Sequence, residues 1–433
     1  MKTIFLVFLT FLTVFSSAQN YTTNEQLLKE FQDIKFGMFV HWGPVSLKGT
    51  EIGWSRGREV PAEEYDNLYK EFNPTKFNAN DWIKTLKDAG MKYFIVTSRH
   101  HDGFSIWPTE YSEYDIEATP YKKDVLMEMK NACDKYGILF GTYYSICDWK
   151  HPDYPLGSPG GKTKKETGNM EKFIPFLKGQ TKELIEKYNS KILWFDGEWE
   201  EPWTHEMGLD FYQYLKGLDE NILINNRVDK GRKGMEGITI SKEFAGDFAT
   251  PEQRVGTYDI ENPWESCITI CNQWAWKPDD KMKSLEQSLF TLIKTVGGGG
   301  NLLFNVGPMP DGRIEPRQVE RLKEMGSWLE KYGEAIYGTK GGPYKPNQWL
   351  ASTRKGNTVY LHLMNYKKQQ LEVPFPEDVK IESCKILKGK KLDFEKSSEV
   401  LKIELPKNNN ELVTVVEVKI EGNSEKLETI EIY

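Results

Sequence analysis

One aspartate in the chain is placed where an enzyme could use it as a nucleophile. Asp196 comes directly after the apolar stretch Lys191–Phe195 and is followed by Gly197, which lets backbone or a ligand approach closely. An aspartate here could also serve only as a helix N-cap or a turn residue. Hydrolysis of a glycoside requires a second carboxylate as acid/base. The candidates by position, which spacing alone does not separate, are Glu198, Glu200, Glu201, Glu243, Glu252 and Glu261.

Three of the six histidines also follow apolar stretches within a few residues. His41 follows Phe36–Val40, and His100 and His101 come soon after Tyr93–Thr97. Any one of these histidines could have a purely structural role, but three of them at the same end of the expected strands favour a functional site. Adjacent residues at a strand end point in opposite directions, so His100 and His101 cannot easily reach one ion, and no HExxH spacing is present. We therefore expect hydrogen bonding to ligand hydroxyls, with no metal and no cofactor.

Two further motifs are better explained by packing. The glycines Gly297–Gly300 precede an apolar stretch and no Gly-Lys-Ser/Thr follows, so close backbone packing is favoured over a phosphate site. The chain has five cysteines, an odd number that indicates no full disulfide framework. Cys267 and Cys271 lack a second pair at metal-ligand spacing, which makes a zinc site improbable.

The elements that must position these residues alternate between strands and helices. Strands are expected at Phe36–Val40, Tyr93–Thr97, Ile138–Tyr144, Lys191–Phe195, Ile222–Asn225 and Asn301–Val306. Helices are expected at Asn80–Ala89 (capped by Asn80 or Asp81), Asp124–Tyr136, Phe176–Tyr188 and Ser284–Thr295. Strands that are apolar on both faces are typical of a parallel sheet covered by helices. Polar residues just after successive strands favour a (β/α)8 TIM-like barrel, with a doubly wound open sheet as the alternative.

The pattern changes near Tyr337. Gly338–Pro346 is rich in turn residues and is interpreted as a linker. Short stretches of alternating character follow, at Thr358–Leu363, Lys380–Leu387, Leu412–Ile420 and Leu427–Tyr433. They predict a C-terminal antiparallel β-sandwich. We therefore expect an α/β barrel over residues 19–340 and a sandwich domain over residues 341–433.

The first 18 residues have the features of a secretory signal peptide. Lys2 provides a positive start, the twelve residues Ile4–Phe15 are apolar apart from two threonines, and Ser16-Ser17-Ala18 offers a cleavage site. The run is too short to span a bilayer, so no membrane insertion is expected. The protein is predicted to be exported, to the periplasm or the medium, or to lysosomes in a eukaryote.

The amino-acid composition limits the classes of molecule that the protein is expected to bind. The chain has 433 residues, with 57 Lys and Arg against 64 Asp and Glu and a net charge of −7. It lacks the basic excess that is usual in nucleic-acid-binding proteins. Its 13 Trp, 21 Tyr and 22 Phe are numerous enough to build both a core and a sugar-binding wall. No feature of the sequence indicates an oligomeric state.

The motifs occur together in an order that resembles one enzyme family. They are Phe39–Pro44, Ser98–Phe104, Thr142–Ser145, Trp194–Gly197, Asn225–Arg227, Gly246–Glu252 and Gly300–Pro308. This ordered set is similar to the α-L-fucosidases of glycoside hydrolase family 29, over roughly Glu30 to Thr339. The resemblance implies a (β/α)8-like barrel with a sandwich tail, no metal, and a retaining two-step mechanism on a fucosylated oligosaccharide or glycoconjugate.

The resemblance also implies roles for individual residues. Asp196 matches the nucleophile, and Glu252 matches the acid/base, with Glu243 as the fallback. Residues that match substrate-binding positions are His41, Trp54, His100, His101, Tyr143, Trp194, Arg227 and Trp274. The alternatives are a non-hydrolytic fucose-binding protein on the same scaffold and a glycosidase for another sugar.

Overall fold

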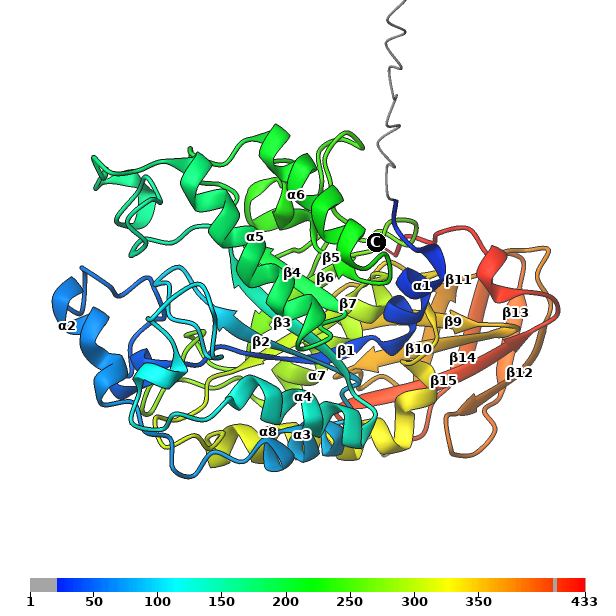
Figure 1. Ribbon diagram of the computed structural model, residues 1–433. Helices are drawn as coiled ribbons and strands as arrows, with labels where there is room; N and C mark the ends of the chain where they lie inside the picture. The colour runs from blue at the N-terminus through cyan, green and yellow to red at the C-terminus, as the bar shows by residue number, and fades with distance from the viewer. Residues whose placement is uncertain (1–21, 408–410, 433) are drawn as a thin grey trace, which may run out of the picture.

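The computed structural model describes residues 22–407 and 411–432, so the expected signal peptide lies outside the described residues (Figure 1). The first part of the chain is an α/β unit built on a curled sheet of seven parallel strands, in the order β5-β4-β3-β2-β1-β7-β6. The strands are β1 (Phe36–Val40), β2 (Tyr93–Arg99), β3 (Leu139–Ser145), β4 (Ile192–Asp196), β5 (Leu223–Ile224), β6 (Glu265–Thr269) and β7 (Asn301–Val306). This order is that of a barrel opened between β5 and β6. It differs from the doubly wound alternative, in which the order reverses at the first strand.

An irregular segment occupies the gap where an eighth strand was expected. Residues 247–253 hydrogen-bond to both edges of the sheet: the Asn226 amide donates to the Phe248 carbonyl, and the Glu265 amide donates to the Ala249 carbonyl, both at 2.9 Å. The contacts are isolated bridges instead of a ladder. Pro251 in this segment has no N–H to donate, which works against a regular strand. The expected eight-stranded barrel is therefore observed as seven strands and a connecting segment.

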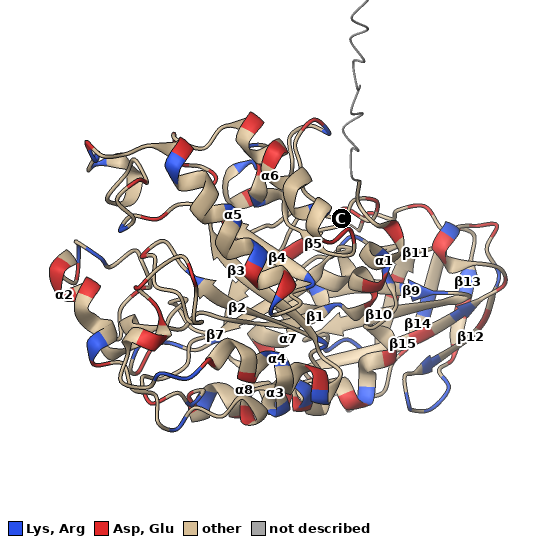
Figure 2. Ribbon diagram, in the orientation of Figure 1, with Lys and Arg blue, Asp and Glu red and all other residues tan. Residues whose placement is uncertain are grey.

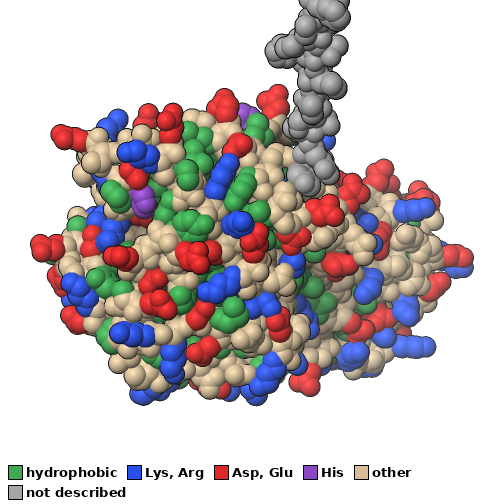
Figure 3. All heavy atoms as spheres, in the orientation of Figure 1, with side chains coloured by type: hydrophobic (Ala, Val, Ile, Leu, Met, Phe, Trp, Pro, Cys, Tyr) green, Lys and Arg blue, Asp and Glu red, His purple; other side chains and the backbone are tan. Residues whose placement is uncertain are grey.

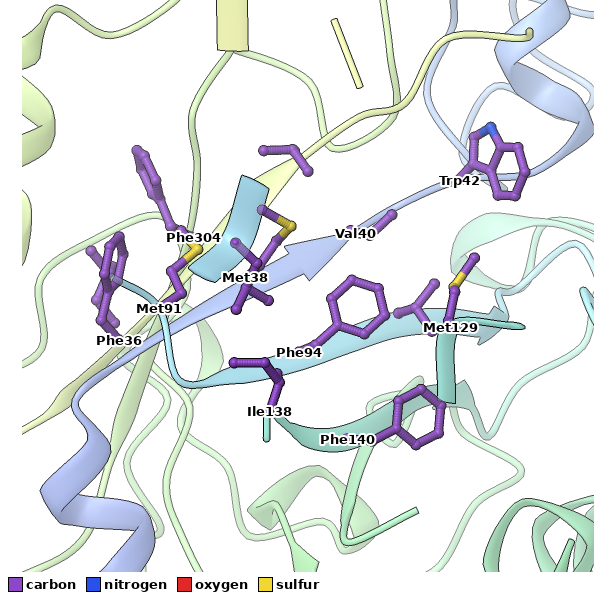
Figure 4. Packing of buried hydrophobic residues seen from close by; sticks show 14 of the residues in the cluster. Phe36, Met38, Val40, Trp42, Met91, Phe94, Met129, Ile138, Phe140 and Phe304 are labelled. Atoms are coloured by element: carbon purple, nitrogen blue, oxygen red, sulfur yellow. The ribbon is translucent and has the colours of Figure 1, made fainter. Parts of the chain in front are cut away.

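Side chains of the sheet separate into an inner and an outer layer with the two-residue period of a strand. On β1, Phe36, Met38 and Val40 face outward and pack with Phe94 and Phe304 against the helices (Figure 4). Phe39 faces inward and belongs to a separate interior cluster. The same parity turns Ile192, Trp194 and Asp196 of β4 toward the interior. The nucleophile candidate therefore points into the barrel because it shares a face with Trp194.

Helices cover the outside of the sheet (Figure 1). The covering helices are α3 (Ala79–Asp88), α4 (Val125–Tyr136), α5 (Met170–Glu186), α6 (His205–Leu218), α7 (Leu285–Gly297) and α8 (Pro316–Tyr332). Two helices lie elsewhere, α1 (Glu25–Ile34) and α2 (Ala62–Asn67), and α2 packs its Tyr65 into a separate small cluster. Helix α1 has a different place: its Phe31 contacts Tyr93 and Phe248 in the interior cluster, at ring-centroid distances of 5.3 and 5.0 Å. It closes the end of the barrel away from the polar strand ends.

Capping residues set the helix starts. The α4 prediction is confirmed, with Asp124 as N-cap and Gly137 as a left-handed C-cap. The expected cap of α3 is wrong: Asn78 accepts the amide of Asp81, so the helix starts at Ala79. Helix α5 starts six residues before the predicted Phe176, because the Asn169 side chain accepts from the amides of Glu171 and Lys172.

The glycine run lies where the two parts of the chain meet. A Cβ on Gly297 would come within 3.0 Å of the Ala351 Cβ, and one on Gly299 within 2.3 Å of the Asp259 carbonyl oxygen. The Gly342 amide donates to the Gly297 carbonyl at 3.1 Å. Close backbone packing at this run is therefore confirmed.

The C-terminal part consists of two antiparallel sheets, ordered β12-β15-β10-β9-β8 and β11-β14-β13, around a shared core that includes Leu361, Leu371 and Leu401. The strands are β8 (Lys340–Gly341), β9 (Leu350–Lys355), β10 (Thr358–Met364), β11 (Gln370–Pro374), β12 (Ile381–Ile386), β13 (Phe394–Ser397), β14 (Val400–Glu404) and β15 (Val413–Ile420). The predicted strand Leu427–Tyr433 is wrong. Ile430 makes only a single bridge, to Tyr344, because the neighbouring backbone is the short linker and offers no longer ladder.

Charges are spread over the molecule. Acidic and basic residues are interspersed along the ribbon (Figure 2) and on the face shown in Figure 3. All five cysteines are free and buried. In residues 22–407 and 411–432, no helix combines the length and apolarity needed to cross a bilayer.

Gly326 in α8 tests the packing of the helix layer. A Cβ there would lie 1.9 Å from the Asp88 carbonyl oxygen at the end of α3. Gly326→Ala should therefore destabilise the protein by about 1–3 kcal/mol through overpacking and lower its melting temperature. This loss is expected even though alanine has the higher helix propensity. The matched control is Gly217→Ala on the exposed side of α6, which should leave stability unchanged or slightly raised. Equal effects of the two variants in thermal unfolding would contradict this packing.

Candidate active site

A cavity of about 200 Å³ lies at the C-terminal ends of the parallel strands, where the barrel prediction placed it. Its lining residues are Phe39, His41, Trp54, His100, Tyr143, Trp194, Asp196, Trp199, Arg227, Arg232, Met235, Glu252 and Trp274. The volume is below the range of about 300–1,000 Å³ that is usual for drug-sized ligands. It fits a single sugar ring better than an extended chain.

A larger hollow of about 470 Å³ lies elsewhere, between residues 238–251 and 257–264. Its two carboxylates already have structural partners. Asp247 accepts from Lys216 and Tyr212, and Asp259 accepts the amides of Glu261 and Asn262. The smaller cavity is therefore the better candidate for chemistry.

Asp196 ends β4 with its carboxylate in the cavity. Its Oδ1 accepts from Arg227 Nη1 at 2.6 Å, and its Oδ2 accepts from the Tyr143 hydroxyl at 3.2 Å. Burial alone would raise the pKa of Asp196, but the cations Arg227 and Arg232 outweigh it and hold the pKa below its ordinary value. The carboxylate is ionised and aimed at the space a ligand would occupy.

Arg227 joins Asp196 to a second carboxylate. Its Nη2 donates to Glu252 Oε2 at 2.9 Å, and Thr250 accepts from its Nε at the same distance. The Arg227 side chain is 1 % exposed, whereas that of Glu252 is 19 % exposed. Glu252 belongs to the irregular segment 247–253. One guanidinium therefore holds two carboxylates side by side, with Glu252 nearer the solvent.

The other carboxylate candidates lie elsewhere or have structural partners. Glu200 accepts from the Trp149 indole and the Tyr154 hydroxyl. Glu201, Glu243 and Glu261 are exposed and do not line the cavity. Glu198 is buried and pairs with Arg232 Nε at 2.6 Å, and burial raises its pKa. Glu252 is the candidate that shares the cavity with Asp196.

His41 presents a hydrogen-bond acceptor to the cavity. Its Nδ1 donates to Asn305 Oδ1 at 2.6 Å, which leaves Nε2 as the unprotonated nitrogen. Burial lowers the pKa of His41 to about 3, so the ring is neutral. The amide nitrogen of Asn305 also donates to the Trp274 carbonyl at 2.7 Å. Asn305 on β7 thus fixes both His41 and Trp274.

His101 lies behind the cavity wall, against the nucleophile candidate. Its Nδ1 is 2.6 Å from Ser145 Oγ, whose own proton is donated to the Cys147 carbonyl, so Nδ1 is the donor. Nε2 is therefore an acceptor; it has no hydrogen-bond partner and lies 3.6 Å from Asp196 Oδ2. Burial lowers the pKa of His101 to about 4. The structure thus places His101 beside the nucleophile candidate but not among the residues that line the cavity.

His100 stacks on Tyr143, with ring centroids 5.2 Å apart and planes 8° apart. The rings of His100 and His101 are only 4.1 Å apart, so the argument that they must point in opposite directions is wrong. Both residues follow the last residue of β2, Arg99, and the strand alternation no longer applies to them. Gly53, with a φ of 65°, makes room, because a Cβ there would lie 2.8 Å from His100 Nδ1.

Four cavity residues were not predicted from the sequence: Phe39, Trp199, Arg232 and Met235. The strand period could have identified Phe39, which lies two residues before His41 and therefore on the same inward face. Trp199 stacks over Trp54 at 6.3 Å and 15°. Arg232 and Met235 come from the loop before segment 247–253, and the sequence of this loop has no regular period. Trp199, Arg232 and Met235 lie at the mouth of the cavity, whereas Phe39 is fully buried inside it.

Metal ligands are not grouped in the described part of the chain. Residues 22–407 and 411–432 contain no cluster of three or more His, Cys, Asp or Glu side chains that could hold an ion.

Comparison with known proteins agrees with this geometry. Residues 13–334 match the family described as Alpha-L-fucosidase. The plasma α-L-fucosidase of Pongo abelii is 32 % identical over 366 residues, covering 77 % of this chain and 76 % of that protein.

Solved structures show the same relationship. α-L-Fucosidase isoenzyme 1 from Paenibacillus thiaminolyticus is 29 % identical, with a TM-score of 0.83, covering 92 % of this chain and 99 % of the other. An α-L-fucosidase from Bacteroides thetaiotaomicron, solved as a trapped covalent intermediate with 2-fluoro-fucosyl fluoride, has a TM-score of 0.84 at 29 % identity, covering 93 % and 98 %. The protein described here belongs to the α-L-fucosidase family.

Proposed function

We propose that this chain is an exo-acting, retaining α-L-fucosidase that releases terminal α-L-fucose from a fucosylated oligosaccharide or glycoconjugate. The observation that carries the proposal is the pair of carboxylates, Asp196 and Glu252, held by one guanidinium in a cavity the size of one sugar. Retaining glycosidases need two carboxyl groups about 5–5.5 Å apart. Asp196 and Glu252 accept hydrogen bonds from the two terminal nitrogens of Arg227, which holds the two carboxyl groups close together.

Asp196 is the proposed nucleophile. It is the more buried carboxylate, and its lowered pKa keeps it ionised for attack on the anomeric carbon. Attack forms a fucosyl ester and breaks the glycosidic bond. Water later attacks the same carbon, releases Asp196 and gives fucose with retained configuration.

Glu252 is the proposed acid/base. Its position toward the solvent lets it protonate the leaving oxygen in the first step and deprotonate water in the second. For the first step it must move from Arg227 to the glycosidic oxygen. The irregular segment that carries it lacks a continuous ladder, which favours such a movement.

The remaining cavity residues are proposed to recognise fucose. His41 offers a neutral acceptor nitrogen to the cavity, and Tyr143 offers a hydroxyl. His101 lies behind the cavity wall beside Asp196 and is proposed to contribute from there. The C6 methyl group of fucose needs an apolar wall, which the aromatic rings supply; those that line the cavity are Phe39, Trp54, Trp194, Trp199 and Trp274.

The finer architecture and location belong to the same proposal. Segment 247–253 takes the place of one strand in a (β/α)8-like barrel of residues 19–340, followed by the sandwich of residues 341–433. The charged start, apolar run and Ser-Ser-Ala end of residues 1–18 support a signal peptide and export.

Hydrolysis of a glycoside panel tests the function. The purified protein should release 4-nitrophenol from the α-L-fucoside far faster than from other glycosides, and NMR should show the α anomer of fucose first. Binding of fucose without release would favour a sugar-binding protein. Preference for another glycoside would favour a different glycosidase, and the β anomer as first product would exclude retention.

Two alanine variants separate the carboxylate roles. Asp196→Ala should abolish turnover of every fucoside, because no leaving group can replace the nucleophile. Glu252→Ala should affect poor leaving groups most, and added azide should restore turnover and yield α-fucosyl azide, since azide needs no base and attacks the fucosyl ester from the face opposite Asp196. Glu243→Ala is the matched control and should behave as wild type. Azide rescue of Glu243→Ala but not of Glu252→Ala would reassign the acid/base.

The ionisation of Asp196 should depend on Arg227. Removing the cation in Arg227→Gln should raise the pKa of Asp196, so activity is lost at a higher pH as the solution is acidified. The acidic limb of the kcat/KM profile should shift upward, and kcat/KM should fall about 10²–10³-fold. Arg232→Gln, which removes a more distant cation, should shift the limb less. An unshifted limb in a folded Arg227→Gln protein would contradict the assignment.

A further inference from the structure

One buried carboxyl group in the barrel has no part in the proposed chemistry. Glu265 opens β6 and is 0 % exposed. Its Oε1 accepts from the indole N–H of Trp194 at 3.0 Å, and its Oε2 hydrogen-bonds to the Tyr93 hydroxyl. Three strands, β2, β4 and β6, thus meet at one polar group in an otherwise apolar interior layer. Apolar side chains of similar volume often stabilise a core better than a buried ionisable group.

The partner of Glu265 supports the groups around the nucleophile. The Arg227 guanidinium carbon lies 4.4 Å from the centroid of the Trp194 ring, a cation–π contact. Tyr143 stacks on the same indole, with centroids 5.7 Å apart and planes 21° apart. Arg227 and Tyr143 are the two residues that hydrogen-bond to Asp196. One indole ring therefore packs against both residues that hydrogen-bond to the Asp196 carboxylate.

We propose that Glu265 is a positioning residue for catalysis: by holding the Trp194 indole through its N–H, it fixes Arg227 and Tyr143, and through them Asp196 and Glu252. The inference rests on the proposed fucosidase function. Glu265 touches neither substrate nor reacting atoms, and its effect passes entirely through Trp194.

The protonation of Glu265 fits this role. Burial raises its pKa to about 8, even though the hydrogen bonds from Tyr93 and Trp194 act in the opposite direction. Near neutral pH the group is therefore mainly a neutral acid, which accepts from Trp194 without adding a third carboxylate anion to the two that Arg227 already binds. Glutamine has the same shape and the same acceptor toward Trp194, so it can replace the neutral acid.

Two substitutions test the hydrogen bond directly. Glu265→Leu removes the acceptor and should lower kcat on the order of 10- to 100-fold, as small displacements of catalytic groups do. Glu265→Gln should restore kcat to within a few-fold of wild type. Tyr93→Phe is the matched control: it removes the other hydrogen bond of Glu265, leaves the Trp194 contact, and should keep kcat near wild type.

A double-mutant cycle shows whether the effect passes through Trp194. Trp194→Phe keeps an aromatic ring but has no N–H, so Glu265→Leu should cost far less in that background than in wild type. A residue that only supports the fold would cost the same in both. If the leucine variant does not fold, Glu265→Asp serves in its place. Its side chain is one methylene shorter, which moves the acceptor away from Trp194, so kcat should also fall.

Stability gives an independent readout. The raised pKa means that folding favours the protonated group, so its stabilising contribution is full below the ordinary pKa of about 4.5 and is lost as pH rises toward 8. Glutamine does not titrate, so the melting temperature of Glu265→Gln relative to wild type should rise across this interval. A constant difference would contradict the neutral, buried state of Glu265.

The outcomes separate this inference from the function itself. Wild-type kcat in folded Glu265→Leu or Glu265→Asp, or a fully additive cycle, would overturn the positioning role and leave the fucosidase intact. A wild-type protein without activity on any fucoside would instead refute the proposed function.

Discussion

The ion pairs of Arg227 are the interaction on which the site depends. A guanidinium that is 1 % exposed would be very costly without partners. It has two carboxylates and Thr250 as hydrogen-bond partners and an indole beneath it. The partners come from two elements: Asp196 and Trp194 from β4, and Thr250 and Glu252 from the segment beside β6. The curl of the sheet brings these elements together, so the site could not form on a flat sheet.

The break in the sheet serves the same arrangement. A regular strand between β5 and β6 would satisfy more backbone groups but would fix each side chain to one face. Segment 247–253 bonds to both neighbours only at isolated points. Its backbone therefore delivers Thr250 to the Arg227 Nε and Glu252 to the Arg227 Nη2. Thr250 and Glu252 are two residues apart, so a regular strand would also place both side chains on one face. Pro251 lies between them, however, and it has no N–H to donate to the hydrogen-bond ladder of such a strand.

How far the site can be predicted from the sequence depends on its local surroundings. Asp196 and His41 follow strong apolar strands, so their place at the rim was predictable. Glu252 could be selected only through the family resemblance, because its segment has no period and β6 was not recognised. His100 and His101 illustrate another limit, since the strand alternation ends at Arg99. The cap at Asn78 and the irregular tail after Ile420 depended on which backbone groups lay nearby in the folded chain.

Burial divides the ionisable groups of the barrel into charged and neutral members. The charged side chains are paired: Arg227 with Asp196 and Glu252 in the cavity, and elsewhere Arg99 with Asp148, Lys216 with Asp247 and Arg232 with Glu198. Around them the histidines are neutral: burial lowers the pKa of His41 to about 3 and that of His101 to about 4, and holds that of His100 well below its ordinary value. None of these rings gains a proton between pH 5 and 8, so their acceptor nitrogens stay available to hydroxyl groups throughout. Within that interval, we therefore expect the pH dependence of catalysis to come from the carboxyl groups of the site and not from these three histidines.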